Sequence, residues 1–474
     1  MSKATSLSEV VSAFALDVYR APQRLPTTLL DTAAARVLDN IGCMYFGLRV
    51  PPAFKTVEMV VRMGQGQCPV IGFDRNTSPT AAALAHGILA QSFEMNDLGA
   101  YVHAGACVVP ASMSALACVQ TPVTGAQFSA AVALGYEVTV RLAEAIGPGA
   151  ELDIGWHTPG FHGAVGASVA TALLLGGDAD MVAQTISIAA DLAGGGLMVA
   201  RLGSDTKRLH CGRGAETAMF AALLAREGLR CRLDALEHAD WGYCRAMAGG
   251  KPAADLAALT DQLGAHWVGF DRTAVKYYCV GAEVLGAIDN LNVLKARDGF
   301  RISDIESITV GTPAFFVKAE SHKYPGSPTE VHFNVEYAIA MALLHDIRPV
   351  YEEGGGLLSI WMSGYENPEV RQLSRKVRHV VDSELEERNP YSVDSKVTVR
   401  FKDGSAASSE TAYVKKASSP GTMRFAPMGI DRIKAKFVSL TGHALSPESQ
   451  NEFMDCVLSL PQAPSASVLL EKIC

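Results

Sequence analysis

The sequence predicts a mainly α protein, with one large all-helical part and a smaller α+β part inserted into it. Three observations lead to this prediction. Apolar residues recur at helical spacing from Ser6 to His266, with little of the alternation that marks a strand. Strand alternation begins only after Trp267, and the C-terminal tail returns to helical spacing. The length of 474 residues also exceeds that of one ordinary domain. We therefore place the helical part at 1–270, the α+β part at 271–417, and a tail at 418–474 that rejoins the helical part.

The helical part reads as a succession of helices joined by short Gly- and Pro-rich loops. Its first helix is expected at Leu7–Tyr19, where Val11, Phe14 and Val18 follow helical spacing. A short extended piece is expected at Cys68–Gly72. Further helices are expected at Leu29–Phe46, Val57–Met63, Ala81–Phe93, Pro110–Val119, Gly125–Ile146, Gly163–Leu175, Met181–Leu192, Ala215–Arg226 and Asp255–Leu263.

The α+β part is marked by two alternating segments, Ile305–Val310 and Lys396–Phe401. Lys402-Asp403-Gly404 predicts a hairpin turn from the second segment into a strand at Ala406–Val414. The remaining helices are expected at Ala282–Val293, Asn334–Leu344, Ile430–Leu440 and Pro447–Leu460. Ser418-Ser419-Pro420-Gly421 marks the expected boundary before the tail.

Composition excludes several classes of protein. The net charge of −8 without a basic tract argues against binding to nucleic acid or to an anionic membrane surface. The ten cysteines form no close Cys-x-x-Cys pair, so neither a zinc ribbon nor a dithiol redox motif is indicated. No signal core or long uninterrupted apolar segment occurs. We expect a cytoplasmic protein with reduced thiols.

A polar stretch interrupts an otherwise apolar region between residues 81 and 119. Within residues 93–106 stand two carboxylates, an amide and an imidazole, from Glu94, Asp97, Asn96 and His103. Burying such groups without partners costs about 1–3 kcal/mol each. The stretch is therefore either a compensated polar loop between two helices or part of a functional site.

Three further clusters could carry chemistry. The segment 155–163 is a Gly/Pro-rich loop with His157, and 203–214 contains Lys207, Arg208, His210 and Arg213 just before an expected helix. Lys276 follows at the start of the α+β part. Cations and free amides at a helix N-terminus both favour a carboxylate or phosphate ligand.

Each cluster also has an ordinary structural explanation. His103 and His157 could be hydrogen-bonded core histidines, and Lys207 and Arg213 could lie on a solvated face. Lys276 could lie across the neighbouring tyrosines. The glycines at 194–196 lack the strand and the Gly-Lys-Ser/Thr of a P-loop. Asp97 and His103 lack the spacing of a helical metal site, so we expect neither metal nor cofactor.

Taken in order, these clusters resemble the motifs of the MmgE/PrpD family, which includes 2-methylcitrate dehydratase, cis-aconitate decarboxylase and iminodisuccinate epimerase. The likeness runs over nearly the whole chain. The matching segments are Glu94–Leu98 before His103 and Val109-Pro110, Gly135–Val138 before Arg141-Leu142, Gly155–His157, Thr206–His210 with Gly212-Arg213, Lys276–Tyr278, and Tyr337–Ala340. The resemblance implies a large helical domain, a small α+β lid domain and a homodimer.

Some positions depart from the family pattern. Asn96-Asp97-Leu98 replaces the usual Asp-Asp-Thr, and Ala104 follows His103 where proline is common. Cys279-Val280-Gly281 replaces a proline, or in some members a histidine. The threonine and the lid histidine are assigned to the substrate site in decarboxylating members. These departures favour a hydro-lyase slightly over a decarboxylase.

The resemblance and the chemistry of small polycarboxylates together suggest roles. Negative charge develops beside a carboxylate, so cations must neutralise it while groups that titrate near neutral pH move protons. We expect Lys207, Arg213 and Lys276 to bind carboxylates, with His210 and Asn96 also contacting substrate. His103 and His157 are the expected acid/base pair. Glu94 and Asp97 would orient a histidine or hold it protonated, and Tyr324 would donate a proton from the lid.

The expected function is a cofactor-independent lyase that acts on a small di- or tricarboxylic acid. One rival is an epimerase or isomerase of a dicarboxylate that uses the same two histidines as opposed bases. Another is a ligand-binding protein that retains the fold without the chemistry.

Overall fold

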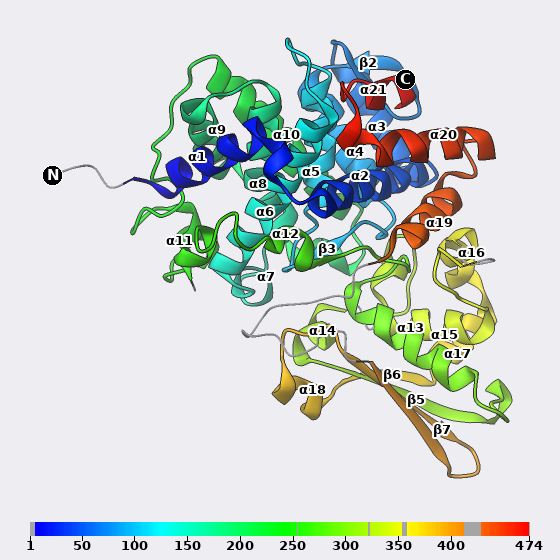
Figure 1. The fold of residues 1–474 in the computed structure, drawn as a ribbon. Helices are drawn as coiled ribbons and strands as arrows, with labels where there is room; N and C mark the ends of the chain where they lie inside the picture. The colour runs from blue at the N-terminus through cyan, green and yellow to red at the C-terminus, as the bar shows by residue number, and fades with distance from the viewer. Residues whose placement is uncertain (1–4, 254, 321–322, 353–357, 412–427, 474) are drawn as a thin grey trace. The chain divides into compact units, whose positions relative to one another are not determined.

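The computed structural model describes residues 5–253, 255–320, 323–352, 358–411 and 428–473. The chain divides into two compact units (Figure 1). The helical unit comprises Met1–Leu197, Arg208–Val275 and Pro427–Cys474, and the mixed unit comprises Met198–Lys207 and Lys276–Ala426. The sequence-based division left 198–207 in the helical part, whereas these residues group with the mixed unit. The expected boundary at 418–421 lies outside the described residues.

The helical unit confirms the mainly α prediction. Its α-helices are α1 (Leu7–Arg20), α2 (Thr27–Gly47), α3 (Pro51–Met63), α4 (Pro79–Gln91), α5 (Gly105–Leu116), α6 (Gly125–Ile146), α7 (Gly149–Leu152), α8 (His162–Leu174), α9 (Ala179–Leu192), α10 (Leu209–Arg226), α11 (Tyr243–Met247), α12 (Val268–Asp271), α19 (Ile430–Thr441), α20 (Pro447–Leu458) and α21 (Val468–Ile473). Single 3₁₀ turns are η1 (Pro22–Arg24), η2 (Thr158–Gly160), η5 (Leu256–Leu259) and η9 (Leu460–Gln462).

Helix α8 forms the centre of this unit. All of its residues from His162 to Leu174 are buried, and it contacts α1, α5, α6, α9 and α10. Helix α5 is likewise buried along its whole length. Glycine and alanine make up much of both helices, so neighbouring backbones approach closely and side-chain volume is small. A helix that is apolar on every side belongs in a core, as these two do.

The helical unit also contains two short pairs of strands. β1 (Cys68–Val70) pairs antiparallel with β2 (Phe73–Thr77), so the expected extended piece is one arm of a hairpin. β3 (Leu98–Gly99) pairs antiparallel with β4 (Thr273–Ala274). The second pairing ties the segment between α4 and α5, which contains the predicted polar stretch, to the chain near Arg272.

The mixed unit combines helices with one four-stranded sheet. Its elements are η3 (Met198–Leu202), η4 (Asp205–Arg208, its last residue in the helical unit), α13 (Ala282–Lys295), η6 (Ile302–Asp304), β5 (Ile305–Thr312), α14 (Ala314–Ala319), η7 (Glu330–Phe333), α15 (Val335–Leu344), α16 (Leu358–Ser363), η8 (Gly364–Glu366), α17 (Pro368–Ser374), β6 (Val377–Val381), α18 (Ser383–Arg388), β7 (Ser395–Phe401) and β8 (Ala406–Thr411). The strand order is β6-β5-β7-β8, with β5 parallel to β6 and antiparallel to β7. Helix α13 packs on β7 and β8, and α15 packs on β6 (Figure 1).

The β7–β8 hairpin is confirmed as far as Thr411, where the described part of β8 ends. Other expectations were wrong. Helix α10 begins at Leu209 rather than Ala215, and α5 begins at Gly105, so that Pro110 lies inside a helix. Only η5 forms where a helix was expected at Asp255–Leu263. β6 was missed because Val377–Val381 alternates over too few residues to stand out.

Among the described helices, none combines the length and the apolar character needed to cross a membrane.

Candidate active site

The loop between α4 and α5 places the polar stretch under conformational strain. Glu94, Ala100 and Tyr101 have positive φ angles of 54°, 46° and 59°. This left-handed region is unfavourable for residues with a Cβ atom, and the surrounding structure must enforce it. The β3–β4 pairing provides one constraint: a Cβ atom at Gly99 would lie 1.8 Å from the Arg272 carbonyl oxygen.

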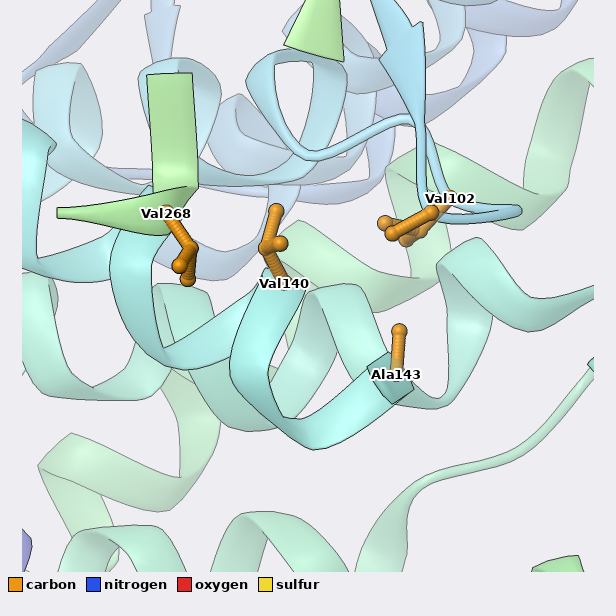
Figure 2. Close-up of a cluster of buried hydrophobic side chains, with 5 residues drawn as sticks. Val102, Val140, Ala143 and Val268 are labelled. Atoms are coloured by element: carbon orange, nitrogen blue, oxygen red, sulfur yellow. The ribbon is translucent and has the colours of Figure 1, made fainter. Parts of the chain in front are cut away.

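A buried apolar cluster fixes the end of the same loop. Figure 2 shows Val102 with Val140 and Ala143 of α6 and with Val268 of α12, and Ala100 completes this cluster. His103 follows directly. Its backbone is therefore anchored by the packing of Val102, which leaves the imidazole as the polar group at the end of the loop.

The His103 ring is oriented by its Nδ1 atom. Nδ1 lies 2.9 Å from the Asp97 carbonyl oxygen and 3.1 Å from Asn96 Nδ2. A carbonyl oxygen only accepts, so the short contact with it requires Nδ1 to carry hydrogen. The Asn96 amide nitrogen also only donates, so with Nδ1 protonated it is a neighbour of Nδ1 and not its hydrogen-bond partner. In the neutral ring, Nε2 then keeps its lone pair and can accept a proton.

A second pair of histidines shares a proton. His157 Nδ1 lies 2.8 Å from His210 Nδ1, and both side chains are buried. One of these nitrogens must donate and the other must accept, so the two rings together carry at most one positive charge while the bond lasts. The backbones of the segments around His157 and Gly196 also lie close together, because the His157 N–H donates to the Gly196 carbonyl at 2.9 Å. A Cβ atom at Gly196 would lie 2.5 Å from the His157 carbonyl oxygen.

The three imidazoles form one group within the helical unit. The ring centroids of His103 and His157 lie 6.1 Å apart, and those of His157 and His210 lie 4.9 Å apart. They come from the α4–α5 loop, the segment before η2 and the first turn of α10. The structure thus brings the two predicted acid/base residues together and adds His210 as a direct partner of His157.

Glu94 and Asp97, which are expected to orient a histidine, lie in the same loop as His103. Glu94 is buried and accepts a hydrogen bond from Gln91 Nε2 at 3.1 Å. The Asp97 carboxylate faces Tyr136, whose pKa is raised well above its usual value by burial and by this neighbouring charge. The Asp97 carbonyl oxygen lies 2.9 Å from His103 Nδ1. The orienting role of the two carboxylates stays a prediction.

Lys207 lies in the mixed unit, on a segment that buried contacts hold in place. Its ammonium lies 5.0 Å from the centroid of the Phe333 ring, and Thr329 Oγ1 donates to Asp205 at 2.5 Å. Arg201 pairs with Glu283 at 2.5 Å. Burial disfavours the Glu283 carboxylate, but Arg201 and a hydrogen bond from Glu320 outweigh burial and lower the pKa of Glu283 to about 2.

The other predicted site residues have diverse surroundings. Lys276 is buried at the start of the mixed unit. The Tyr324 hydroxyl donates to the Tyr365 carbonyl at 3.0 Å, and Arg371 lies 4.6 Å from the Tyr324 ring centroid. Arg213 lies on α10 with 52% of its side chain exposed and pairs with Glu216. This surface ion pair accounts for Arg213 without a substrate.

Two other histidines, His86 and His162, are hydrogen-bonded core residues. His86 Nε2 accepts a hydrogen bond from the Ile71 N–H at 3.1 Å, and burial lowers the pKa of His86 to about 4. His162 Nδ1 lies 2.8 Å from the Tyr243 hydroxyl, and burial lowers the pKa of His162 to about 3. Both are neutral at pH 7 and bonded inside the helical unit.

Sequence reasoning missed several contacts that support the site. Arg208 Nε donates to the Ser92 carbonyl at 3.2 Å, just before Glu94. Lys436 is fully buried and contacts Asp39 and the Met95 carbonyl. The sequence does contain a pattern that predicts burial of Lys436. Lys436 falls on the same helical stripe as Ile433, Phe437 and Leu440, all of which are buried. A charge on an apolar stripe marks a buried pair.

Among the described residues, no group of three or more histidine, cysteine, aspartate or glutamate side chains is arranged to hold a metal ion.

Comparison with known proteins identifies the family. The model of the MmgE/PrpD N-terminal domain matches residues 15–256, and that of the MmgE/PrpD C-terminal domain matches residues 278–462. The chain belongs to the MmgE/PrpD family. The family resemblance seen in the sequence is therefore confirmed.

Relatives within the MmgE/PrpD family match over nearly their full length. Cis-aconitate decarboxylase of Aspergillus terreus is 28% identical over 467 residues, which cover 94% of this chain and 92% of the relative. A cis-aconitate decarboxylase-like protein of Aspergillus oryzae, oryM, is 26% identical, with 95% and 94% covered. Cis-aconitate decarboxylase of Mus musculus is 26% identical, with 91% and 86% covered.

Proposed function

We propose that this member of the MmgE/PrpD family is a cofactor-independent lyase that acts on a small di- or tricarboxylic acid. Decarboxylation of cis-aconitate is the first reaction to test, because the relatives named above are cis-aconitate decarboxylases or resemble them. The observation that carries the proposal is the group of three imidazoles, in which His103 lies beside the hydrogen-bonded His157–His210 pair.

Decarboxylation of cis-aconitate requires the enzyme to supply one proton to a carbon atom of the substrate. When the bond to the carboxylate of the CH₂ arm breaks, its electron pair forms a new terminal double bond. The old double bond gives its electrons to the CH carbon beside the remaining carboxylate, and that carbon takes one proton. An acid must therefore stand at this carbon, and an imidazolium with a pKa near neutral pH suits the role.

The imidazoles differ in the proton that each could supply. His103 holds hydrogen on Nδ1 for the Asp97 carbonyl, so its reactive atom is Nε2. His157 and His210 hold one proton between their Nδ1 atoms, so Nε2 is the nitrogen of His157 that we propose for proton exchange with substrate. We propose His103 and His157 as the acid/base residues and His210 as the residue that sets the tautomer of His157. Lys207, Lys276, Arg213, Asn96 and Tyr324 stay predicted substrate or proton-transfer residues.

The test is a screen by proton NMR without added metal. The protein is incubated with cis-aconitate, citrate, 2-methylcitrate or citramalate, first in H₂O and then in D₂O. Appearance of a terminal methylene group with release of carbon dioxide from cis-aconitate supports decarboxylation. Loss of water from citrate or 2-methylcitrate instead identifies a hydro-lyase. Deuterium in recovered substrate without loss of either identifies an epimerase, and loss of turnover with a chelator contradicts the metal-free mechanism.

We further propose that the protein is a cytoplasmic homodimer. The family resemblance supports the dimer, and light scattering on the eluting protein peak tests it. A mass of one 50.2 kDa chain would contradict this part of the proposal.

A further inference from the structure

A buried lysine of the C-terminal segment reaches the loop that bears His103. Lys436 lies on α19, and its side chain is fully buried. Its ammonium lies 2.6 Å from Asp39 Oδ1 on α2 and donates to the Met95 carbonyl at 2.6 Å. Asp39 is fully buried as well. One charged group thus joins α2, α19 and the α4–α5 loop.

Stability alone does not explain this choice of residues. Removing a charged pair from water costs about as much as the pair regains, and a well-packed apolar pair is often as stable or more stable. What an apolar pair cannot do is donate a hydrogen bond to a backbone carbonyl. The contact that only Lys436 supplies is therefore the one to Met95.

The Met95 carbonyl occupies a sensitive place in the loop. It follows Glu94, whose φ angle of 54° is strained, and it precedes the two residues that touch His103. Those contacts are Asn96 Nδ2 and the Asp97 carbonyl oxygen on Nδ1 of the ring. Movement of the Met95 peptide would shift the Asp97 carbonyl that accepts from His103 Nδ1 and the Asn96 amide beside it.

A second cation braces the same loop from its other side. Arg36 Nη2 donates to the Thr273 carbonyl at 2.8 Å, and Thr273 pairs with Gly99 through β4 and β3. The charged groups that act on Asp39 include Lys436, Asp97 and Arg36. Burial raises the pKa of Asp39, the Lys436 ammonium opposes that rise, and the Asp97 charge adds to it. Lys436 and, more weakly, Arg36 both favour the charged form of Asp39 against burial.

We propose that Lys436 is a positioning residue for His103, which it holds in the Nδ1–H tautomer through the Met95 carbonyl. The effect on turnover rests on the proposed lyase function, whereas the effect on the ring does not.

The test separates position from stability with a charge-balanced pair of substitutions. Lys436→Met alone leaves Asp39 buried without its cation, so the midpoint of thermal unfolding falls. Asp39→Asn with Lys436→Met removes both charges, and the midpoint is expected within a few degrees of wild type. In this double variant kcat is expected to fall at least tenfold while KM changes less than twofold. Lys434→Met, a partly exposed position on the same helix, is the matched control.

A direct measurement on the ring makes the test independent of activity. Nitrogen-15 NMR of histidine-labelled protein reports the tautomer of each imidazole, and His103→Gln assigns the His103 signal. The double variant is expected to lose the Nδ1–H pattern of His103. Asp39→Asn with Lys436→Gln retains an N–H donor and is expected to recover part of it.

A double variant with wild-type kcat and an unchanged His103 signal would overturn the proposal. If the wild type turns over none of the acids tested, the lyase proposal fails. The nitrogen-15 result still decides whether Lys436 positions His103. If the Met double variant does not fold, Asp39→Asn with Lys436→Gln decides: loss of the Nδ1–H pattern despite a retained donor contradicts the role of Lys436.

Discussion

His157 Nδ1 and His210 Nδ1 lie 2.8 Å apart, so one proton serves two buried rings. This arrangement fixes which nitrogen of His157 is available to a substrate. It also means that the two residues act as one titrating unit, and a kinetic pKa assigned to either belongs to the pair.

Substitution of the two partners should therefore have unequal effects. His157→Gln removes a proposed acid/base residue and is expected to lower kcat at least about 100-fold. His210→Gln retains a hydrogen-bonding side chain beside His157 and is expected to lower kcat about 10-fold. Steady-state kinetics measure both, with His238→Gln as a control outside the imidazole group. Equal losses would contradict the division of roles.

The same variants distinguish an enzyme from a ligand-binding protein. His103→Ala and His157→Ala are expected to abolish turnover while cis-aconitate still raises the midpoint of thermal unfolding. Calorimetric scans with and without 10 mM of the acid, a concentration of the order that a weak carboxylate site requires, measure this. A wild type that is stabilised by the acid but shows no turnover would favour the binding protein.

A charge placed beside His103 should shift its titration. Asn96 Nδ2 lies 3.1 Å from Nδ1, so Asn96→Asp places a carboxylate where it favours the imidazolium. The pH profile of kcat/KM is expected to move its histidine limb upward by about one unit. Asn96→Leu removes the contact without adding charge and should move the limb less. An unmoved limb in the Asp variant would assign that limb to another residue.

The predicted carboxylate ligands can be tested separately. Lys207→Met and Lys276→Met are each expected to raise KM by about 10-fold or more, since a charge-assisted hydrogen bond is worth about 1.5–3 kcal/mol. Lys318→Met, at an exposed position of the mixed unit, is the control. Arg213→Met decides between its two interpretations. A raised KM supports the sequence-based assignment, and an unchanged KM supports the surface pair with Glu216.

The core histidines make stability depend on pH. The pKa values of His86 and His162 are about 4 and about 3 in the folded protein, below the unfolded value of about 6.5. The unfolded chain therefore binds protons first as the pH falls. Their contribution is fully present above pH 6.5, and each group loses about 1.4 kcal/mol per pH unit below it until its folded pKa is reached. Urea unfolding at pH 7.5, 6.5 and 5.0 measures the decline, and His86→Gln should make it less steep.

The helices and the sheet strands differ in how well the sequence predicts them. Leu7–Arg20 and Gly125–Ile146 follow a 3.6-residue period over several turns, so their existence and limits could be read from the residues. Val377–Val381 is short, and its partner β5 lies far away in sequence. No local signal specifies such a pairing. The early start of α10 was hidden because Lys207, Arg208 and Arg213 look like a polar loop.

In the candidate site, too, the sequence indicates which residues matter but not which residues they contact. The residue types at 94–103 and at 157 indicated a functional site, because polar groups stand there among apolar neighbours. Their contacts did not follow from the sequence. That Asp97 meets His103 through its carbonyl, and that His210 meets His157, depends on backbone torsions and packing that only the folded chain specifies.

The Asp39–Lys436 pair sets an order of events during synthesis of the chain. Asp39 and all three imidazoles leave the ribosome early, while the lysine that neutralises Asp39 follows almost 400 residues later. Until α19 docks, this part of the nascent core must keep the carboxyl group hydrated or protonated. We therefore expect the loop of His103 to reach its final form only after α19 docks, and a chain that ends before residue 430 carries His103, His157 and His210 without the Lys436 ammonium.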